Sequence, residues 1–388
     1  FLTTVLLGLI SRKTVPAFKP IAFWGSIWVL VTMIPVATYF FISTDLRNSR
    51  YLYLPSVGFC IGLAYILYLE LPSGILKTLR RALVTSLIVF YALTTMRHNL
   101  AWNKAGETTL KITQQLTALY PQLPEGTHLY LWGIPNNING AYVYLGDPQI
   151  NATIQLLYNT PAGVRGTLIN GRDYGREGRP DLSALDLGGS DLVFKWGKEG
   201  RLMDFSEELK ALLQERESLA AQQGDTLPTW QFADQIVANQ WELIHQLRKS
   251  PASIGTMPTF IATGSDPYMH SPRVTLSPLA VGAVEIKMRV TSSHQGSSYG
   301  EFFWVTKADS VFDEVKHVVF PIVVDGQFHV YKLDLSNNLT WLTGGTITQL
   351  RLDPTVIPAK IQIEYIKLIP YKSASAFLSR HSIRFRWL

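Results

Sequence analysis

Three residues at the start of an apolar run carry groups that could bind a phosphate. Arg50, Tyr51 and Tyr53 stand just before and within the run Leu52–Leu69. A guanidinium group offers an oxyanion a planar fork of donors, and each tyrosine hydroxyl adds one more. Aromatic rings and a cation at a lipid–water boundary can equally anchor a membrane span. The stretch therefore predicts either a lipid-phosphate site or an interfacial anchor.

A second group of candidate residues lies in the C-terminal third of the chain. Trp304, Tyr331 and Trp341 are candidate platforms for sugar rings, with packing in a protein core as the alternative for each. Asp266 and Asp353 could ligate a calcium ion through their carboxylate oxygens, although each also begins an Asp-Pro turn. Calcium is therefore a candidate cofactor, and no other cofactor is expected.

Several kinds of site are excluded by the residues that the chain contains. Cys60 is its single cysteine, so neither a disulfide nor a cysteine-based zinc site can form within one chain. The eight histidines show no metal-ligand spacing, and no dinucleotide or phosphate-loop fingerprint occurs. The turn Asn136–Gly140 could contact a sugar or a phosphate, but such turns are mostly only turns. No catalytic residue can be assigned from these patterns.

The net charge of +6 comes from the two ends of the chain. Nine Lys/Arg and two acids give residues 1–100 a charge of +7, and four cations without an acid give residues 371–388 a charge of +4. The residues between them therefore carry −5. A basic protein with an acidic body does not present the continuous basic surface that nucleic acid requires, so no nucleic-acid partner is expected.

Four apolar stretches predict that residues 1–97 are a membrane part. Ile21–Ile42 and Leu52–Leu69 approach or exceed the roughly 20 residues that cross a bilayer core. Ala82–Met96 is a shorter third candidate, and Phe1–Ile10 is about half a span. Because the chain begins inside an apolar run, we expect it to be the C-terminal part of a longer membrane protein.

The charges of the connecting loops predict an orientation. Cations gather in residues 11–20 and 70–81, which places both loops in the cytoplasm by the positive-inside rule. The Arg50 loop and everything after Arg97 then lie outside.

The segment Arg50–Gly58 resembles the R-x-x-Y-x-P-S-x-G stretch of GT-C-type polytopic glycosyltransferases. The branch most similar contains the transmembrane-and-TPR mannosyltransferases. The resemblance implies a polyprenyl-phosphate sugar donor and action on the extracytoplasmic face, with Arg50, Tyr51 and Tyr53 at the lipid phosphate. Ser49 stands where the family's motif usually has an acid. The family's catalytic acid lies in an early outside loop, which implies that it precedes this fragment.

Residues 98–222 alternate between helical and strand patterns. Helices are expected at His98–Leu119, Gln149–Tyr158 and Ser206–Glu217. Short strands are expected at His128–Gly133 and Asp191–Trp196. The alternation predicts a small α/β domain, followed by a polar linker at 218–228.

Residues 226–370 change to a period of two and predict an all-β sandwich. The expected strands are Val284–Val290, Glu301–Val305, Val318–Val324, Gln327–Leu333, Gln349–Leu352 and Lys360–Leu368. Asp325-Gly326 between two of them predicts a β-hairpin.

Three segments of this part resemble galactose-binding-like jelly rolls of carbohydrate-active proteins. They are Thr263–Tyr268, Asp325–Tyr331 and Leu350–Pro354. The resemblance implies a carbohydrate-binding module without implying a particular ligand. The basic, aromatic tail 371–388 could lie on an anionic membrane surface or be disordered.

The predicted fold class is multidomain: transmembrane helices (1–97), an extracytoplasmic α/β domain (98–222), a jelly-roll sandwich (226–370) and a tail (371–388). By resemblance, the predicted function is the C-terminal portion of a membrane glycosyltransferase that transfers a sugar from a polyprenyl-phosphate donor to a carbohydrate or protein acceptor. The alternative is a non-catalytic, membrane-anchored carbohydrate-binding protein. A third interpretation is a transporter or an assembly component. It is disfavoured because the predicted spans carry few ionisable residues. Membrane lipid is an expected partner, and the bacterial inner membrane is the expected location.

Overall fold

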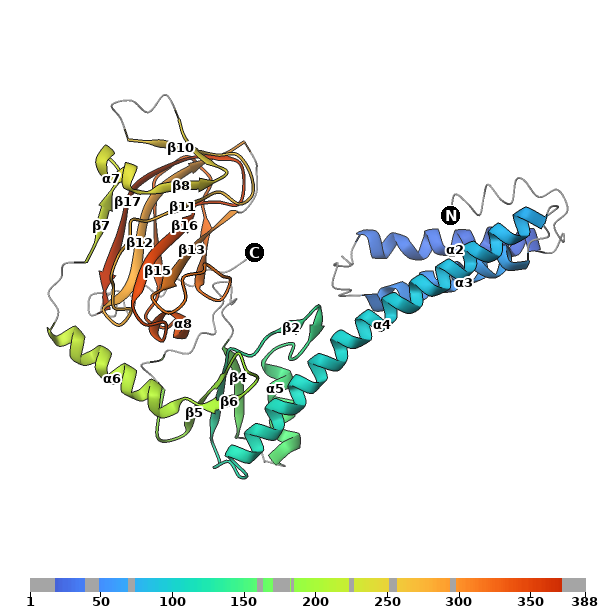
Figure 1. Cartoon of the computed structure of the whole chain (residues 1–388), viewed down its shortest axis with the longest axis horizontal. Coiled ribbons are helices and arrows are strands. Elements are labelled where there is room, and N and C mark those ends of the chain that lie inside the picture. The colour runs from blue at the N-terminus through green and yellow to red at the C-terminus, as the bar shows by residue number, and fades with distance from the viewer. Residues whose placement is uncertain are drawn as a thin grey trace. The chain divides into compact units, whose positions relative to one another are not determined.

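The computed structural model describes residues 18–38, 49–68, 74–158, 163–169, 182, 185–222, 227–250, 257–293 and 298–371. The chain divides into two compact units. The first is Phe1–Gln114 with Pro135–Leu145, and the second is Gln115–Ile134 with Gly146–Leu388. Figure 1 labels the elements.

Helices form the first unit. They are α2 (Phe18–Thr38), the 3-10 turn η1 (Ser49–Leu52), α3 (Tyr53–Tyr68) and α4 (Gly74–Leu119), whose last residues belong to the second unit. Glycines let α2 and α3 approach closely: a Cβ atom at Gly58 would lie 2.5 Å from the carbonyl oxygen of Gly25. A two-stranded hairpin, β2 (Asn137–Ile138) and β3 (Ala141–Tyr142), completes the unit.

The hairpin between β2 and β3 contains the predicted turn cluster. Asn139 and Gly140 both have positive φ angles, 49° and 89°, as a two-residue hairpin turn requires. The Asn-Gly pair explains the turn, because these two residue types adopt such angles at the lowest cost.

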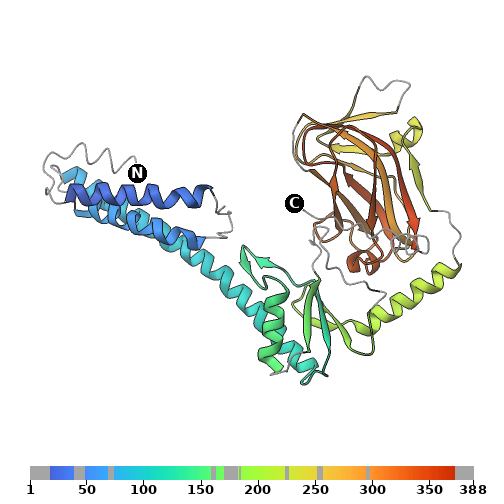
Figure 2. The ribbon, with the colours of Figure 1, turned by 180° about the vertical axis from the view of Figure 1, so that it is seen from behind.

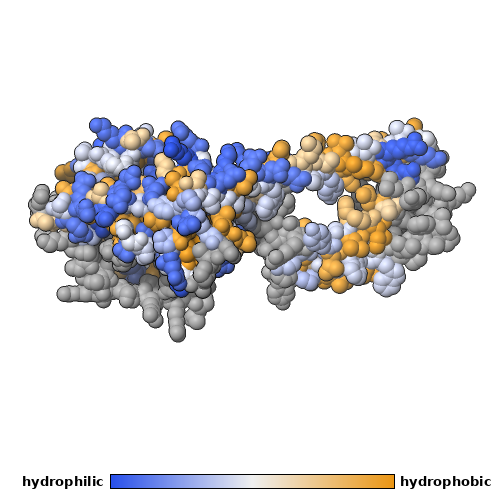
Figure 3. Space-filling model, turned by 90° about the horizontal axis from the view of Figure 1, so that it is seen from below, coloured by the Kyte–Doolittle hydropathy of each residue, from blue (hydrophilic) through white to orange (hydrophobic). Residues whose placement is uncertain are grey.

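Apolar side chains cover the outside of the helical unit. Trp24 and Phe90 are each more than 60% exposed, and Figure 3 shows further hydrophobic residues in orange along these helices. Among the described helices, only α4 is long and apolar enough to cross a membrane by length and composition, and α2 and α3 contain the shorter apolar stretches Phe23–Ala37 and Tyr53–Ala64. The predicted third span and the predicted exit helix are one continuous helix, α4, so no break occurs at residue 97.

The second unit begins with a small α/β layer. Its sheet has the order β4 (Arg165–Ile169), β1 (His128–Trp132), β5 (Asp191–Trp196) and β6 (Leu202–Asp204), with only β6 antiparallel. Two helices accompany it, α5 (Asp147–Tyr158) and α6 (Ser206–Gln222). The alternation of helical and strand patterns in the sequence thus correctly predicted an α/β layer here.

Helix α5 is fastened to the edge strand β4. The side chain of Asn151 accepts a hydrogen bond from the backbone N–H of Gly166 (2.8 Å) and donates one to its carbonyl (3.2 Å). Gly166 leaves room for the helix, since a Cβ atom there would lie 2.2 Å from Ile150.

Helix α6 continues into the predicted linker and packs on the domain that follows. Its buried Arg216 donates to the carbonyl of Ser336 at 2.8 Å and lies over the ring of Tyr371. The hydroxyl of Tyr371 donates to Glu217 at 2.7 Å. Helix α6 ends at Gln222, so residues 218–222 belong to the helix and not to the predicted linker.

The rest of the unit is a sandwich of two antiparallel sheets, as the period of two predicted (Figures 1 and 2). The six-stranded sheet consists of β15 (His329–Asp334), β12 (Val281–Thr291), β17 (Ala359–Pro370), β10 (Thr259–Ala262) and β9 (Leu247–Lys249), with β7 (Thr229–Gln231) also paired to β17. The five-stranded sheet consists of β14 (His317–Ile322), β13 (Ser298–Thr306), β16 (Ile347–Asp353), β11 (Tyr268–His270) and β8 (Glu242–His245). Two short helices, α7 (Gln235–Gln240) and α8 (Leu339–Leu342), complete it. Most successive strands lie in opposite sheets, as in a jelly roll, whereas β9 pairs with β10 and β13 with β14 within one sheet.

The hairpin predicted around Asp325-Gly326 is wrong. Strand β14 pairs with β13 in one sheet, whereas β15 pairs with β12 in the other. The turn itself is present: Gly326 has a φ of 75°, and the Asp325 carboxylate accepts a hydrogen bond from the backbone of Gln327. A turn signal fixes a reversal of the chain, but core packing decides which strands pair across it.

Candidate functional site

The outward face of the five-stranded sheet gathers polar and aromatic side chains. Along β13, Glu301 and Phe303 point away from the sandwich core, and the alternate residues Phe302 and Trp304 point into it. Register places Asp353 of β16 opposite Glu301, and Arg351 opposite Phe303. Strand β11 adds Tyr268 and His270 on the far side of β16.

Arg351 lies at the centre of this face. Its Nε donates to Asp353 Oδ1 at 2.7 Å, and its Nη2 donates to the other Asp353 oxygen and to Asp266 Oδ1 at 3.2 Å. The guanidinium carbon also lies 3.7 Å from the ring centre of Tyr268 and 4.6 Å from that of Phe303. Two aromatic rings and two carboxylates therefore fix its orientation.

Four aromatic rings form a continuous row beside Arg351. We call this row the ring row, and it consists of His245, Tyr268, His270 and Phe312. Successive ring centres lie 5.6, 5.5 and 4.7 Å apart, with interplanar angles near 30° or less. Burial and the positive charge of Arg351 lower the pKa of His270 below its usual 6.5. Its imidazole is therefore neutral at pH 7, so it adds no charge to the ring row.

Acidic groups line the other side of Arg351. Burial raises the pKa of Glu301 to about 7, and the nearby carboxylates of Asp353 and Glu314 add to the effect. Burial also raises the pKa of Asp353 to about 6, against the opposing influence of Arg351. In this cluster the carboxyl groups outnumber the guanidinium, so it favours a cation or a neutral hydrogen-bonding ligand over an anion.

The loop 307–316 between β13 and β14 closes one border of the face. It brings Phe312 to His270 and Glu314 to His317. Lys316 holds the loop from beneath, with its nearly buried ammonium 3.0 Å from Asp309.

Two of the predicted sugar platforms are core residues in the structure. Trp304 and Trp341 are fully buried and meet edge to face, with ring centres 5.2 Å apart. Tyr331 is 9% exposed and uses its hydroxyl to accept a hydrogen bond from the backbone of Val323. Their burial favours the core-packing alternative for all three, because a sugar ring needs an accessible aromatic face.

The two aspartates proposed as calcium ligands lie near each other, and both contact Arg351. A cation already lies between their carboxylates. Arg351 therefore supplies the charge compensation that calcium would have supplied there.

The residues of the predicted phosphate site lie at the start of α3. Arg50 and Tyr51 belong to η1, and Tyr53 begins α3 with 77% of its surface exposed. Their proximity along the chain agrees with either a phosphate site or an anchor, and phosphate binding stays a prediction.

Sequence reasoning missed most of the residues on the outward face. In the sequence, Arg351 and Tyr268 stand out only as members of segments that resemble jelly rolls, and the spacing of the histidines does not indicate His317 as a ligand. One signal could have found part of the face: in a strand, Glu301 and Phe303 must share a side that excludes Trp304. Nothing in the sequence indicates that residues 268, 317 and 351 meet.

Comparisons with known proteins find similarity of structure only. No family profile and no curated protein matches the chain. Among solved structures, the C-terminal CBM6 of LamC, a marine laminarinase from Zobellia galactanivorans, is 10% identical, with a TM-score of 0.23, and the match covers 37% of this chain and 98% of that one.

Two other solved structures give similar values. CsCBM6-3 from Clostridium stercorarium in complex with cellobiose is 9% identical at a TM-score of 0.24, and the match covers 37% of this chain and 93% of that one. CBM28, a carbohydrate-binding module specific for non-crystalline cellulose, is 9% identical at a TM-score of 0.27, and the match covers 38% of this chain and 96% of that one. Values of this size assign no family to the chain.

Proposed function

We propose that this chain is a membrane-anchored carbohydrate-binding protein, with its sugar site on the outward face of the five-stranded sheet. The observation that carries the proposal is the ring row beside Arg351 and its carboxylates. It offers ring faces and hydrogen-bonding groups side by side on one sheet.

Sugar rings need this combination of surfaces. A pyranose has a face of C–H groups, which packs on an aromatic ring, and a rim of hydroxyl groups, which donate and accept hydrogen bonds. On this sheet Tyr268 and His270 offer the stacking surface. Asp266 accepts and Arg351 donates within reach of the same rings.

The charge of the face restricts the sugar class. The carboxyl groups of Asp266, Glu301, Glu314 and Asp353 outnumber the single guanidinium of Arg351. An anionic polysaccharide would be repelled at neutral pH, whereas a neutral glycan would find acceptors for its hydroxyls. We therefore infer that the ligand is a neutral glycan.

The helical unit supplies the proposed anchor. Its exposed apolar side chains on α2, α3 and α4 would be costly in water and stable in lipid. The cationic loops support an orientation with the sandwich outside the cytoplasm.

The proposal is tested with the full chain in detergent micelles. A glycan array carrying neutral and acidic oligosaccharides identifies the ligand class, and calorimetry then measures the affinity of the best binder. Tyr268→Ala should weaken binding about tenfold, since stacking on one ring contributes about 1.5 kcal/mol. The matched control is Phe328→Ala, which removes a ring lying under Arg289 beside the other sheet.

Equal losses of affinity in Tyr268→Ala and Phe328→Ala would contradict the proposed site. A preference for acidic glycans would contradict the inference of a neutral ligand. Glycosyl transfer stays a separate prediction, which rests on the Arg50–Gly58 resemblance. It is examined in the same preparation by supplying a polyprenyl-phosphate sugar and following its consumption. Turnover would favour the transferase over a protein that only binds.

A further inference from the structure

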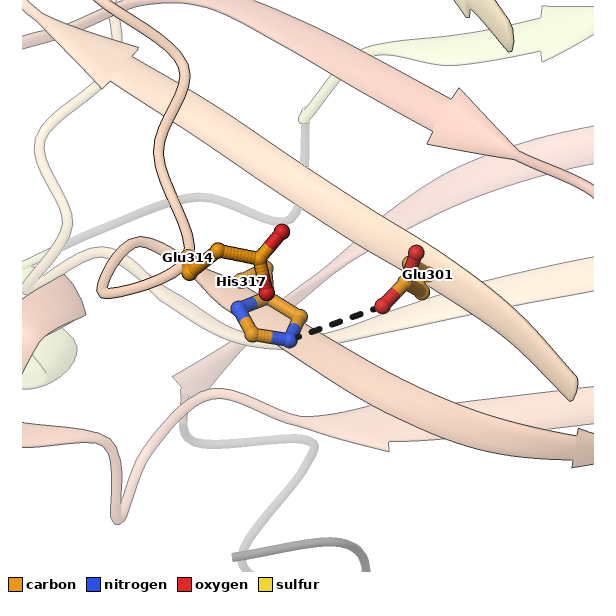
Figure 4. A group of neighbouring side chains, drawn as sticks. All are labelled: Glu301, Glu314 and His317. Atoms are coloured by element: carbon orange, nitrogen blue, oxygen red, sulfur yellow. Dashed lines mark ion pairs between the residues drawn. The ribbon is translucent and has the colours of Figure 1, made fainter. Parts of the chain in front are cut away.

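Three metal-binding side chains converge at the edge of the same sheet (Figure 4). Glu301 comes from β13, His317 from the start of β14, and Glu314 from the loop before it. Each contributes one possible ligand atom, and these three atoms lie within 4.8 Å of one another. Glu314 and His317 lie three residues apart in the sequence, and the pairing of β13 with β14 brings Glu301 to them.

The surrounding structure fixes two of the three groups in place. The His317 ring is buried and stacks on Phe303 with ring centres 4.9 Å apart and planes 18° from parallel. Its Nε2 is directed at the Glu301 carboxylate, 3.7 Å away (Figure 4). Donors held in position before an ion arrives lose little entropy when it binds.

The third group sits on a braced turn. Asp313 Oδ1 accepts hydrogen bonds from the backbone N–H groups of Val315 and Lys316, at 3.0 and 3.1 Å. Glu314 lies between Asp313 and Val315, so these hydrogen bonds hold its backbone, and its side chain is exposed.

The distances suit a small divalent ion. Imidazole nitrogens and carboxylate oxygens lie about 2.0–2.2 Å from zinc, so two ligands of one ion can be at most about 4.4 Å apart. The 3.7 Å between His317 Nε2 and Glu301 already satisfies this limit. Only the exposed Glu314 would need a small movement to bring its oxygen within range.

The electrostatics also favour a cation. Glu301 is half-buried, and the carboxyl groups of Glu314 and Asp353 lie near it. A divalent ion would relieve the repulsion among these groups, and it would hold the Glu301 carboxyl in its ionised form.

The donor set indicates the class of metal. An imidazole nitrogen suits zinc and other divalent transition metals, which also accept carboxylate oxygens as ligands. Calcium prefers oxygen ligands alone and six or more of them, which these residues do not supply.

We propose that Glu301, Glu314 and His317 form a binding site for a divalent transition-metal ion of the zinc type, with at least one coordination position left for water. The ion would join β13, β14 and the loop 307–316, and would therefore stabilise this edge of the sandwich. The site is distinct from the Asp266 and Asp353 pair, which Arg351 already bridges.

The test uses the full chain in detergent micelles, purified without a histidine tag and stripped with a chelator. Zinc is titrated by calorimetry, bound metal is counted after dialysis, and cobalt is substituted to record its visible spectrum. One equivalent should bind, and it should raise the melting temperature of the protein. Glu301→Gln and Glu314→Gln should each lower the affinity at least tenfold and alter the cobalt spectrum.

The Glu314 variant guards against loss of fold, since this side chain is exposed and its removal leaves the core intact. The matched control is His329→Gln, which removes an exposed histidine that pairs with Asp325 at 3.0 Å elsewhere on the sandwich. Stoichiometric binding that survives both glutamate changes, or that is lost with His329, would overturn the proposal. So would the absence of zinc binding in the unmodified chain, or a preference for calcium.

Discussion

Replacing Arg351 tests most directly whether its guanidinium compensates the buried carboxylate of Asp353 on the outward face. Arg351→Met keeps the aliphatic stem and removes the guanidinium, which leaves the Asp353 carboxylate buried with 3% of its side chain exposed. Breaking a buried ion pair from one side costs about 3–5 kcal/mol, because the buried carboxylate either loses its compensation or must take up a proton. Each lost cation–π contact adds about 0.5–1 kcal/mol. The partner Asp266 is 56% exposed, so that pair contributes at most about 1 kcal/mol.

These magnitudes predict an order of stability among three variants. Arg351→Met should destabilise the sandwich most, by about 3–5 kcal/mol. Arg351→Met combined with Asp353→Leu should recover most of that loss, since no unpaired charge remains. Asp266→Ala alone should cost no more than about 1 kcal/mol.

The measurement is pulse proteolysis of the full chain in a urea series, which reports the unfolding of the sandwich by its cleavage. At about 2 kcal/mol per molar of urea, Arg351→Met should move the midpoint down by about 2 M. A shift of less than about 0.5 M, or a double variant less stable than Arg351→Met, would refute the reasoning. It would mean that Asp353 is not held as a buried charge by this arginine.

Three further predictions concern the rest of the chain. Reporter fusions after Arg81 and after Arg97 should report opposite sides of the membrane, and a shared side would contradict the proposed orientation. Arg50→Ala should reduce polyprenyl-phosphate-dependent sugar transfer by roughly ten- to a hundredfold if Arg50 binds the donor phosphate, with partial rescue by Arg50→Lys. The control Arg47→Ala should have little effect, and equal small effects of the two alanine changes would leave only the anchoring role. Burial lowers the pKa of His128 below 6.5. As the pH falls, His128 is therefore protonated at a higher pH in the unfolded chain than in the folded chain. The stability of the α/β layer should then fall as the pH drops below about 6.5. Urea melts between pH 5 and 8 should show a smaller fall in His128→Gln, and an identical profile would refute the assignment.

The sequence by itself determined the type and place of several elements. The alternation around Val284–Val290 identified a half-buried strand, now part of β12, because a strand turns successive side chains to opposite faces. The strand predicted at Asp191–Trp196 has the same bounds as β5 in the structure. Asn139-Gly140 produced a hairpin turn, since both residues tolerate positive φ angles at low cost. Each of these signals is local and depends only on neighbouring residues.

Tertiary structure alone decided which strands pair and which side chains meet. Asp325-Gly326 makes a turn as predicted, but β14 and β15 enter different sheets because each buries its apolar face against a different partner strand. Trp304 and Phe303 are adjacent aromatics, yet the phase of β13 places one in the core and the other beneath Arg351. Strand pairing brings Glu301 to His317, and Glu314 lies on the loop three residues before that histidine. Such contacts depend on the closure of the whole sandwich, which no local pattern of residues encodes.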